Sequence, residues 1–109
     1  MTTLNMKQAV IEAIRNQEWL KITFRRKKDD NYVTRVVAPY DVFPQETGEN
    51  EGKERLSGYT RAHEDYEPGV ITIYLEDMSS VSAIGEHFDG PHIRSLIDPK
   101  RTPYINRSW

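Results

Sequence analysis

The densest group of side chains suited to chemistry is a basic run at residues 25–28. It consists of Arg25, Arg26, Lys27 and Lys28. The turn-forming Asp29, Asp30 and Asn31 follow directly, which predicts that the basic side chains fan out from a strand end and its hairpin. With Arg35 on the returning strand, they could contact several phosphates in a salt-sensitive interaction that is independent of base sequence. The alternative is a solvated hairpin in which Asp29 and Asp30 are local counter-charges.

A second group lies on the segment 55–61, which is expected to be a strand. Because alternate residues of a strand share a face, Arg55, Tyr59 and Arg61 would project together. An aromatic ring flanked by guanidinium groups can stack a base and hold its phosphate, so Tyr59 and Arg61 join the basic run and Arg35 as candidate ligand-binding residues. The same residues would equally suit the wet exterior of a barrel. The acidic neighbours that weaken the local potential are Glu54, Glu64 and Asp65.

The sequence contains no recognised catalytic or metal-binding motif. The nearest approach to a metal site is the group His63, Glu64, Asp65 and Glu67, which has no known ligand spacing and is typical of a polar turn. Neither a G-x-S-x-G elbow nor a glycine-rich phosphate loop occurs. Cysteine is absent, which removes thiol nucleophiles and thiolate ligands. We therefore expect no enzymatic activity, no metal and no cofactor.

The formal net charge of −2 conceals a strong segregation of charge. Residues 1–40 carry eight basic and four acidic side chains, residues 41–89 carry three and twelve, and residues 90–109 carry four and one. Such asymmetry can steer a polyanion toward one region, although an ordinary solvated surface can also show it. Neither a signal peptide nor a membrane span is recognisable. Together with the lack of cysteine, this predicts a cytoplasmic protein without a membrane partner.

Hydrophobic periodicity predicts one helix followed by strands. Apolar residues recur at helical spacing between Met6 and Ile14, which indicates a helix over 5–17 with Asn5 as N-cap and Gln8 as its capping-box partner. Alternation then predicts strands at about 18–25, 32–37, 55–61, 70–75 and 79–88. A short edge strand at 41–43 would be ended by Pro44. The polar residues 45–54 are expected to form the most mobile internal loop.

These elements predict a mainly β (α+β) fold, an N-terminal helix followed by a five-stranded, strongly curved barrel and a C-terminal arm. The 109 residues suffice for one domain, which would span 1–89, with the arm at 90–109 and one helical turn near 92–97. The predicted core consists of Leu20, Ile22, Phe24, Leu56, Ile73 and Leu75, with Val10 and Ile14 packing the helix on the sheet. Tyr104 and Trp109 would fix the arm to the barrel or contact a partner.

The order of these elements resembles the WYL domain, a module of bacterial regulators with an SH3- or Sm-like barrel. The resemblance covers about residues 5–89. The matching patterns are v-x-i-x-F at Leu20, Ile22 and Phe24, r-V-v-x-P-y from Arg35 to Tyr40, the strand from Leu56 to Tyr59, and V-x-x-I-x-x-x-F at Val81, Ile84 and Phe88. The resemblance implies a small barrel that binds nucleic acid or nucleotide-like ligands through basic and aromatic residues.

The chain departs from that family at its most characteristic positions. Where the name-giving Trp-Tyr-Leu would fall, it has Glu54, Arg55 and Leu56, so the leucine alone is kept. Ile71 and Ile73 stand near the places of an arginine and an aromatic residue of the family. One helix precedes the barrel, so we do not expect a complete transcription factor with a helix-turn-helix.

Two hypotheses about function follow. The first is a non-catalytic regulatory or accessory module that binds single-stranded nucleic acid or a nucleotide-like ligand. The second is a protein-interaction subunit, able to self-associate, whose acidic loop at 45–54 and aromatic tail make the contacts and which has no nucleic-acid ligand. Binding to single-stranded nucleic acid distinguishes them.

Overall fold

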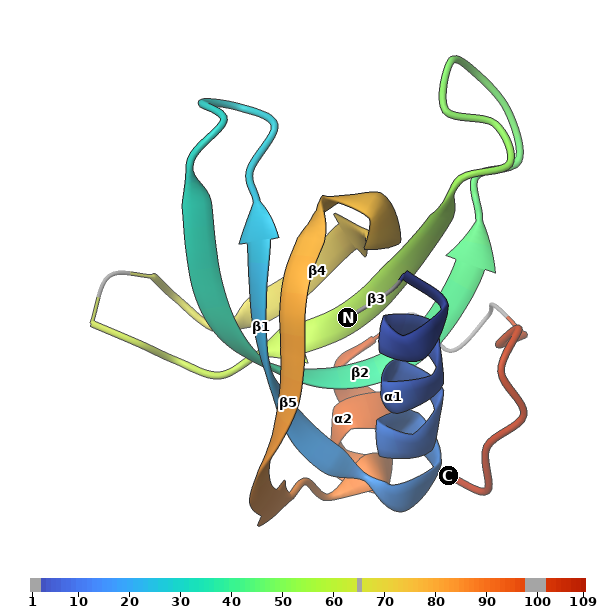
Figure 1. Cartoon of the computed structure of the whole chain (residues 1–109). Helices are drawn as coiled ribbons and strands as arrows, with labels where there is room; N and C mark the ends of the chain where they lie inside the picture. The colour runs from blue at the N-terminus through green and yellow to red at the C-terminus, as the bar shows by residue number, and fades with distance from the viewer. Residues whose placement is uncertain (1–2, 65, 98–101) are drawn as a thin grey trace.

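The predicted helix and strands occur in the expected order in the computed structural model, which describes residues 3–64, 66–97 and 102–109 (Figure 1). The elements are α1 (Thr3–Asn16), β1 (Glu18–Arg25), β2 (Tyr32–Pro44), β3 (Glu54–Thr60), β4 (Gly69–Tyr74), the 3-10 helix η1 (Leu75–Asp77), β5 (Met78–His87) and α2 (Gly90–Leu96). The mainly β, α+β class predicted from the sequence is confirmed.

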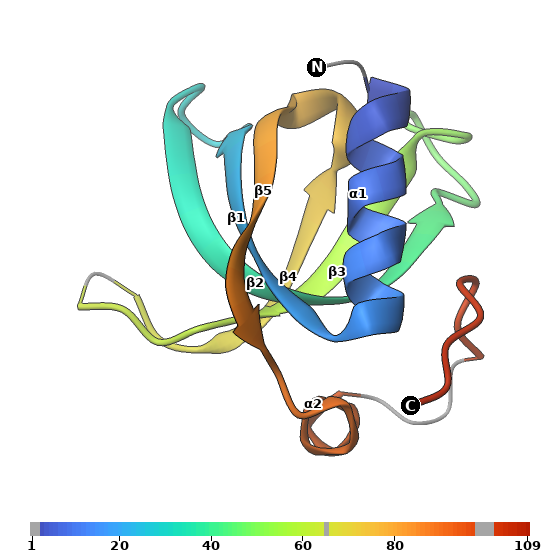
Figure 2. The same ribbon diagram turned by 60° about the horizontal axis from the view of Figure 1, so that its bottom comes forward.

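Helix α1 forms where apolar residues recur three and four positions apart, and it packs alongside the curved sheet (Figure 2). Its buried residues are Met6, Val10, Ala13 and Ile14. The predicted N-cap at Asn5 is wrong, because the helix already includes Thr3 and Asn5 lies within it. The helix ends before Gln17, whose φ of 55° is left-handed. This residue turns the chain so that β1 can begin at Glu18.

The five strands form one antiparallel sheet in the order β4-β3-β2-β1-β5. Strand β2 is 13 residues long, and it pairs with β1 along its first half and with β3 along its second. A strand shared in this way bends, and a register shift between Pro39 and Asp41 accommodates the bend. The predicted separate edge strand at 41–43 is therefore wrong. These residues continue β2 and pair with β3, because the register shift between Pro39 and Asp41 lets the strand run on past Pro39.

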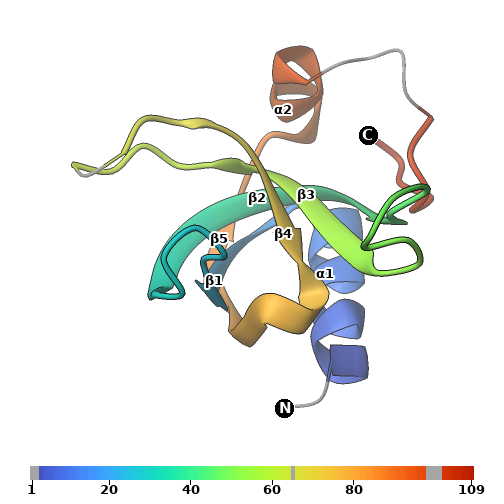
Figure 3. The ribbon, with the colours of Figure 1, turned by 90° about the horizontal axis from the view of Figure 1, so that it is seen from above.

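The sheet is strongly curved but not closed. Strands β4 and β5 are its two edges, and η1 connects them. The barrel predicted from the sequence is thus an open one. Viewed from above, α1 and α2 lie on opposite sides of β2 (Figure 3).

The concave side of the sheet and α1 enclose the core. All six predicted core residues are buried, as are Val10 and Ile14 of α1. Five of the six lie in strands, whereas Leu75, which was predicted to end a strand, lies in η1. Leu20 and Ile22 of β1 lie opposite Val37 and Arg35 of β2, and Leu56 of β3 lies opposite Val42. Burial of each large aliphatic side chain contributes roughly 1.5–3 kcal/mol, so these residues supply much of the stability of the sheet.

The C-terminal residues pack beside the sheet. Helix α2 begins after Asp89, whose side chain accepts a hydrogen bond from the backbone N–H of His92 at 3.4 Å. Ile93 of α2 and Trp109 belong to the same hydrophobic cluster as the sheet. Trp109 is 7% exposed, which confirms for this residue the expected docking on the chain's own domain. Among the described residues, no helix has the length and apolar character needed to cross a membrane.

Candidate ligand-binding surface

The predicted basic run lies in the hairpin between β1 and β2, where the acidic helix η1 meets it. The Arg25 guanidinium is 3.2 Å from Asp77 Oδ1 and 3.4 Å from Asp30 Oδ1. Lys27 Nζ is 3.7 Å from a carboxylate oxygen of both Glu76 and Asp77. The hydrogen bond to Asp77, followed by the charge of Asp30, raises the pKa of Arg25. Two of the four basic side chains are thus paired with carboxylates.

Arg26 is paired within the hairpin itself. Its guanidinium donates two hydrogen bonds to the Asp29 carboxylate, one of them from Nε at 3.1 Å. These bonds, with a further one from the Asn31 backbone, lower the pKa of Asp29 to about 2. Lys28 is exposed and meets no acceptor in the part of the chain that the structure describes. Most of the positive charge of the run is therefore balanced locally.

Arg35 lies apart from the other predicted residues. It pairs with the buried Ile22, so it belongs to the concave side of the sheet. Its guanidinium carbon is 3.9 Å from the centre of the Tyr66 ring, which stacks on His63 at 5.1 Å. Arg35 therefore joins an aromatic stack on the hairpin between β3 and β4.

The same hairpin carries the acidic turn at 63–67, which was the nearest approach to a metal site in the sequence. Glu64 and Glu67 are exposed, and Asp65 lies outside the described residues. No group of three or more His, Asp or Glu able to hold a metal occurs in the described ranges.

The outward residues of β3 form a second surface, as the alternation of the sequence predicts. Alternate positions project from the side opposite the buried Leu56, and the backbone N–H of Arg61 extends the pairing by donating to Val36 O at 2.9 Å. We call Arg55, Ser57, Tyr59 and Arg61 the β3 outer face. The neighbouring outward residues of β2 are Phe43, Asp41 and Ala38, opposite Arg55, Ser57 and Tyr59 respectively.

Both arginines of the β3 outer face stack on aromatic rings. The guanidinium carbon of Arg55 is 4.4 Å from the centre of the Phe43 ring, and that of Arg61 is 4.5 Å from the Trp19 ring. Arg61 also pairs with Glu86. Arg55 Nε, by contrast, is buried and has no acceptor among the described residues. Arg55 therefore retains an unused donor, whereas the charge of Arg61 is balanced.

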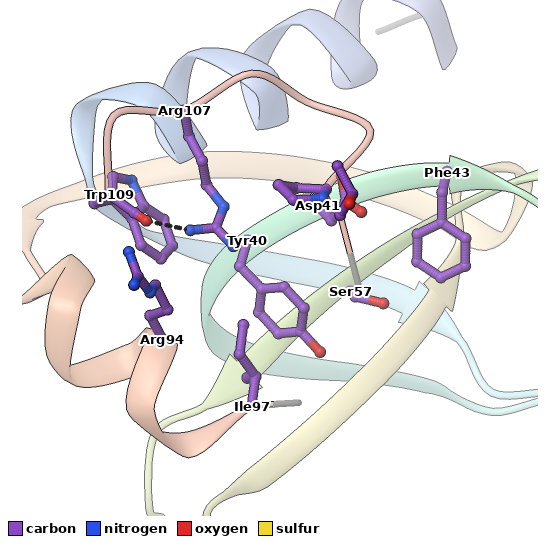
Figure 4. Close-up of a pocket in the computed structure, with 10 residues that line it drawn as sticks. Tyr40, Asp41, Phe43, Ser57, Arg94, Ile97, Arg107 and Trp109 are labelled. Atoms are coloured by element: carbon purple, nitrogen blue, oxygen red, sulfur yellow. Dashed lines mark hydrogen bonds between the residues drawn. The ribbon is translucent and has the colours of Figure 1, made fainter. Parts of the chain in front are cut away.

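A cavity of about 510 Å³ lies beside Ser57, between the sheet and the C-terminal residues (Figure 4). We call it the arm pocket. Its walls comprise Tyr40, Asp41, Phe43 and Ser57 of the sheet, Arg94 and Ile97 of α2 and its end, and Thr102, Pro103, Arg107 and Trp109. The volume lies within the range of roughly 300–1,000 Å³ typical of small-ligand sites.

The arm pocket offers cationic donors that have few acceptors. Arg94 and Arg107 line it, and Arg107 Nε is buried without an acceptor in the described part of the chain. Burial lowers the pKa of Arg107, an effect that the charge of Asp41 opposes. The Asp41 carboxylate already accepts backbone N–H groups of Tyr104 at 3.2 Å and Ile105 at 3.0 Å. An anion entering the pocket would thus meet two guanidinium groups and one occupied carboxylate.

The structure does not gather the seven predicted residues into one site. Tyr59 and Arg61 lie on the same side of the sheet as the arm pocket, whereas the basic run and Arg35 lie elsewhere. Sequence reasoning missed Tyr40, Arg94 and Arg107. The available signal was the excess of basic residues in 90–109, but that segment has no periodicity from which to place its side chains.

No protein-family profile matches the chain, and no curated protein matches it. Its fold is similar to that of proteasome accessory factor B/C (PafBC) of Arthrobacter aurescens, with a TM-score of 0.65 and 19% sequence identity. The match covers 81% of this chain but 12% of that one, so the chain corresponds to a small part of PafBC. This likeness concerns the fold alone, and it supports the WYL-like fold implied by the order of elements.

Proposed function

We propose that this chain is a non-catalytic regulatory or accessory module that binds a nucleotide or single-stranded nucleic acid across the β3 outer face and the arm pocket. The observation that carries the proposal is the pair of buried nitrogens, Arg55 Nε and Arg107 Nε, which meet no acceptor among the described residues. Leaving a buried donor unsatisfied costs about 1–3 kcal/mol. A phosphate oxygen would offset this cost, because phosphate accepts charge-assisted hydrogen bonds from guanidinium groups.

The neighbouring side chains suit the rest of such a ligand. Arg94 and Arg107 could hold one phosphate in the arm pocket, while the Tyr40 ring lines its wall. Tyr59 is half-buried and lies two residues along β3 from Ser57, about 7 Å at the usual strand rise. A base stacked on Tyr59 could therefore belong to the nucleotide next to the one in the pocket. The fold shared with a protein named as an accessory factor is in keeping with a regulatory or accessory role.

The test is fluorescence anisotropy with a labelled oligothymidylate of about eight nucleotides, measured at several salt concentrations. Two double variants each remove two positive charges: Arg94→Gln with Arg107→Gln in the pocket, and Lys27→Gln with Lys28→Gln in the hairpin. The pocket pair should weaken binding and reduce the log–log salt slope by about 0.7, the value for one phosphate, because both side chains contact the same phosphate. The matched hairpin pair should change the slope much less, because Lys27 is already near two carboxylates.

A Tyr59→Ala variant separates stacking from charge. It should weaken binding by about 1–3 kcal/mol per stacked base, with little change in the salt slope. A larger effect of the hairpin pair than of the pocket pair would move the site to the basic run. If the unaltered chain binds neither single-stranded DNA nor RNA at low salt, the proposal fails and the protein-interaction hypothesis replaces it.

A further inference from the structure

One wall of the arm pocket is the C-terminal segment, residues 102–109, which β2 holds in place. The Asp41 carboxylate accepts hydrogen bonds from the backbone N–H groups of Tyr104 and Ile105, at 3.2 and 3.0 Å. The Tyr104 ring stacks on Phe43 with 6.2 Å between ring centres. The segment is therefore attached to the sheet by backbone contacts as well as by side-chain packing.

Trp109 attaches the end of this segment to the core. Its indole N–H donates to Ile14 O at 2.7 Å, and its ring meets Phe88 edge-on at 5.3 Å between centres. A methyl group on Gly90 would lie 2.6 Å from the Trp109 ring, well inside van der Waals contact. The slot for this ring is thus closed on one side by a glycine and requires that glycine.

The position of Arg107 depends on Trp109. The Arg107 guanidinium carbon lies 4.2 Å from the centre of the Trp109 ring, and one terminal nitrogen donates to the Trp109 backbone oxygen at 2.6 Å. The same arrangement leaves Arg107 Nε buried without an acceptor among the described residues. Docking of Trp109 therefore places a partly desolvated cation beside the pocket, at a cost that an anion in the pocket would reduce.

We infer, on the basis of the function proposed above, that docking of residues 102–109 and binding of the phosphate-bearing ligand stabilise each other, with Trp109 as the residue that positions Arg107. A ligand that binds when Arg107 is in place stabilises the docked segment by mass action. Reciprocally, a substitution that weakens docking lowers the apparent affinity, which equals the intrinsic affinity multiplied by the fraction of molecules that are docked. The C-terminal segment is thus part of the ligand site.

The coupling can be measured on the full chain by hydrogen exchange of the Trp109 indole N–H in NMR spectra. Undocking exposes this proton, so bound oligothymidylate at ten times its Kd should slow its exchange by up to about elevenfold. The backbone N–H of Asp30, which donates to Arg26 O at 2.8 Å in the hairpin away from the arm pocket, provides a reference on the same sample. In Arg107→Met, which keeps an apolar side chain over the ring but removes the cation, the oligonucleotide should no longer slow the exchange.

A matched pair of glycine variants tests the reverse direction. Gly90→Ala should force the Trp109 ring from its slot and weaken oligothymidylate binding by about three- to tenfold. Gly69→Ala adds the same methyl group where no atom lies within 4 Å, and it should bind like the unaltered chain. Should Gly90→Ala fail to fold, Trp109→Phe keeps a ring but removes the hydrogen bond to Ile14, and it should show a smaller loss in the same direction.

The outcomes separate the two proposals. If the unaltered chain binds but the exchange of the Trp109 indole does not slow, and Gly90→Ala binds normally, the coupling is refuted while the proposed function stands. Equal slowing in Arg107→Met and in the unaltered chain would also refute it, because Arg107 would not be the link. Absence of binding by the unaltered chain would overturn the proposed function itself.

Discussion

Gly58 of β3 lies opposite Pro39 of β2 and has no room for a side chain, so replacing it tests the packing of the curved sheet. A Cβ added at Gly58 would lie 2.2 Å from Val37 Cγ1 and 3.1 Å from Ala38 O. Val37 is fully buried and cannot move away without disturbing the core. Carbon atoms pack best at about 3.5–4.0 Å, so the overlap with Val37 exceeds an ångström. We expect Gly58→Ala to destabilise the domain by about 2–3 kcal/mol, the upper part of the range for overpacking.

Chemical denaturation of a double-mutant cycle with Val37→Ala checks the cause of this loss. Val37→Ala alone should cost about 1.5–3 kcal/mol, because it removes two buried methyl groups and leaves a cavity. In the double variant the clash with Cγ1 is gone, so the total cost should fall short of the sum by about 1 kcal/mol or more. The relief stays partial because Ala38 O remains close. A cost for Gly58→Ala below about 0.5 kcal/mol, or additivity within that margin, would refute the reasoning.

The other two predictions concern the hairpin and the loop before β3. The pKa of Asp29, lowered to about 2, lies below the ordinary value of about 3.9, so its pairing with Arg26 contributes stability that is present above pH 4 and lost as the pH falls through 2. NMR titration should find this pKa, and Arg26→Gln should return it toward the ordinary value; an unchanged pKa would contradict the pairing. Limited proteolysis should cut first within residues 45–54, which lack apolar side chains and contain Gly48 and Gly52 at positive φ; a first cut elsewhere inside the chain would count against it.

Local pattern was sufficient to predict most of the fold. The alternation at Leu20, Ile22 and Phe24 and the spacing of Val10 and Ile14 identified residues that are buried in the structure. These predictions succeeded because burial of one strand or helix face imposes its own period on the sequence. The segment 41–43 was misassigned because Pro39 and Pro44 are strong local signals for strand ends. A register shift, which no local pattern encodes, allows β2 to continue through this region.

The candidate site was predictable only where it lies on a strand. Alternation alone placed Arg55, Tyr59 and Arg61 on one face of β3. The sequence offered Asp29 and Asp30 as counter-charges of the basic run, and both pair with it. It did not indicate Glu76 and Asp77, which lie about fifty residues later and meet the run because η1 joins the two edges of the curved sheet. Charge interactions act through space, and their partners depend on how the chain is folded.

The sequence by itself determined which side chains are buried and which share a face of a strand, because these properties repeat with the period of the backbone. The tertiary structure decided which charges remain unbalanced. It brought Arg94 and Arg107 of an aperiodic tail beside Ser57 and Tyr40, and it held Arg107 there through Trp109. An aperiodic segment takes its position from the surface on which it docks, and that surface exists only after the sheet has formed.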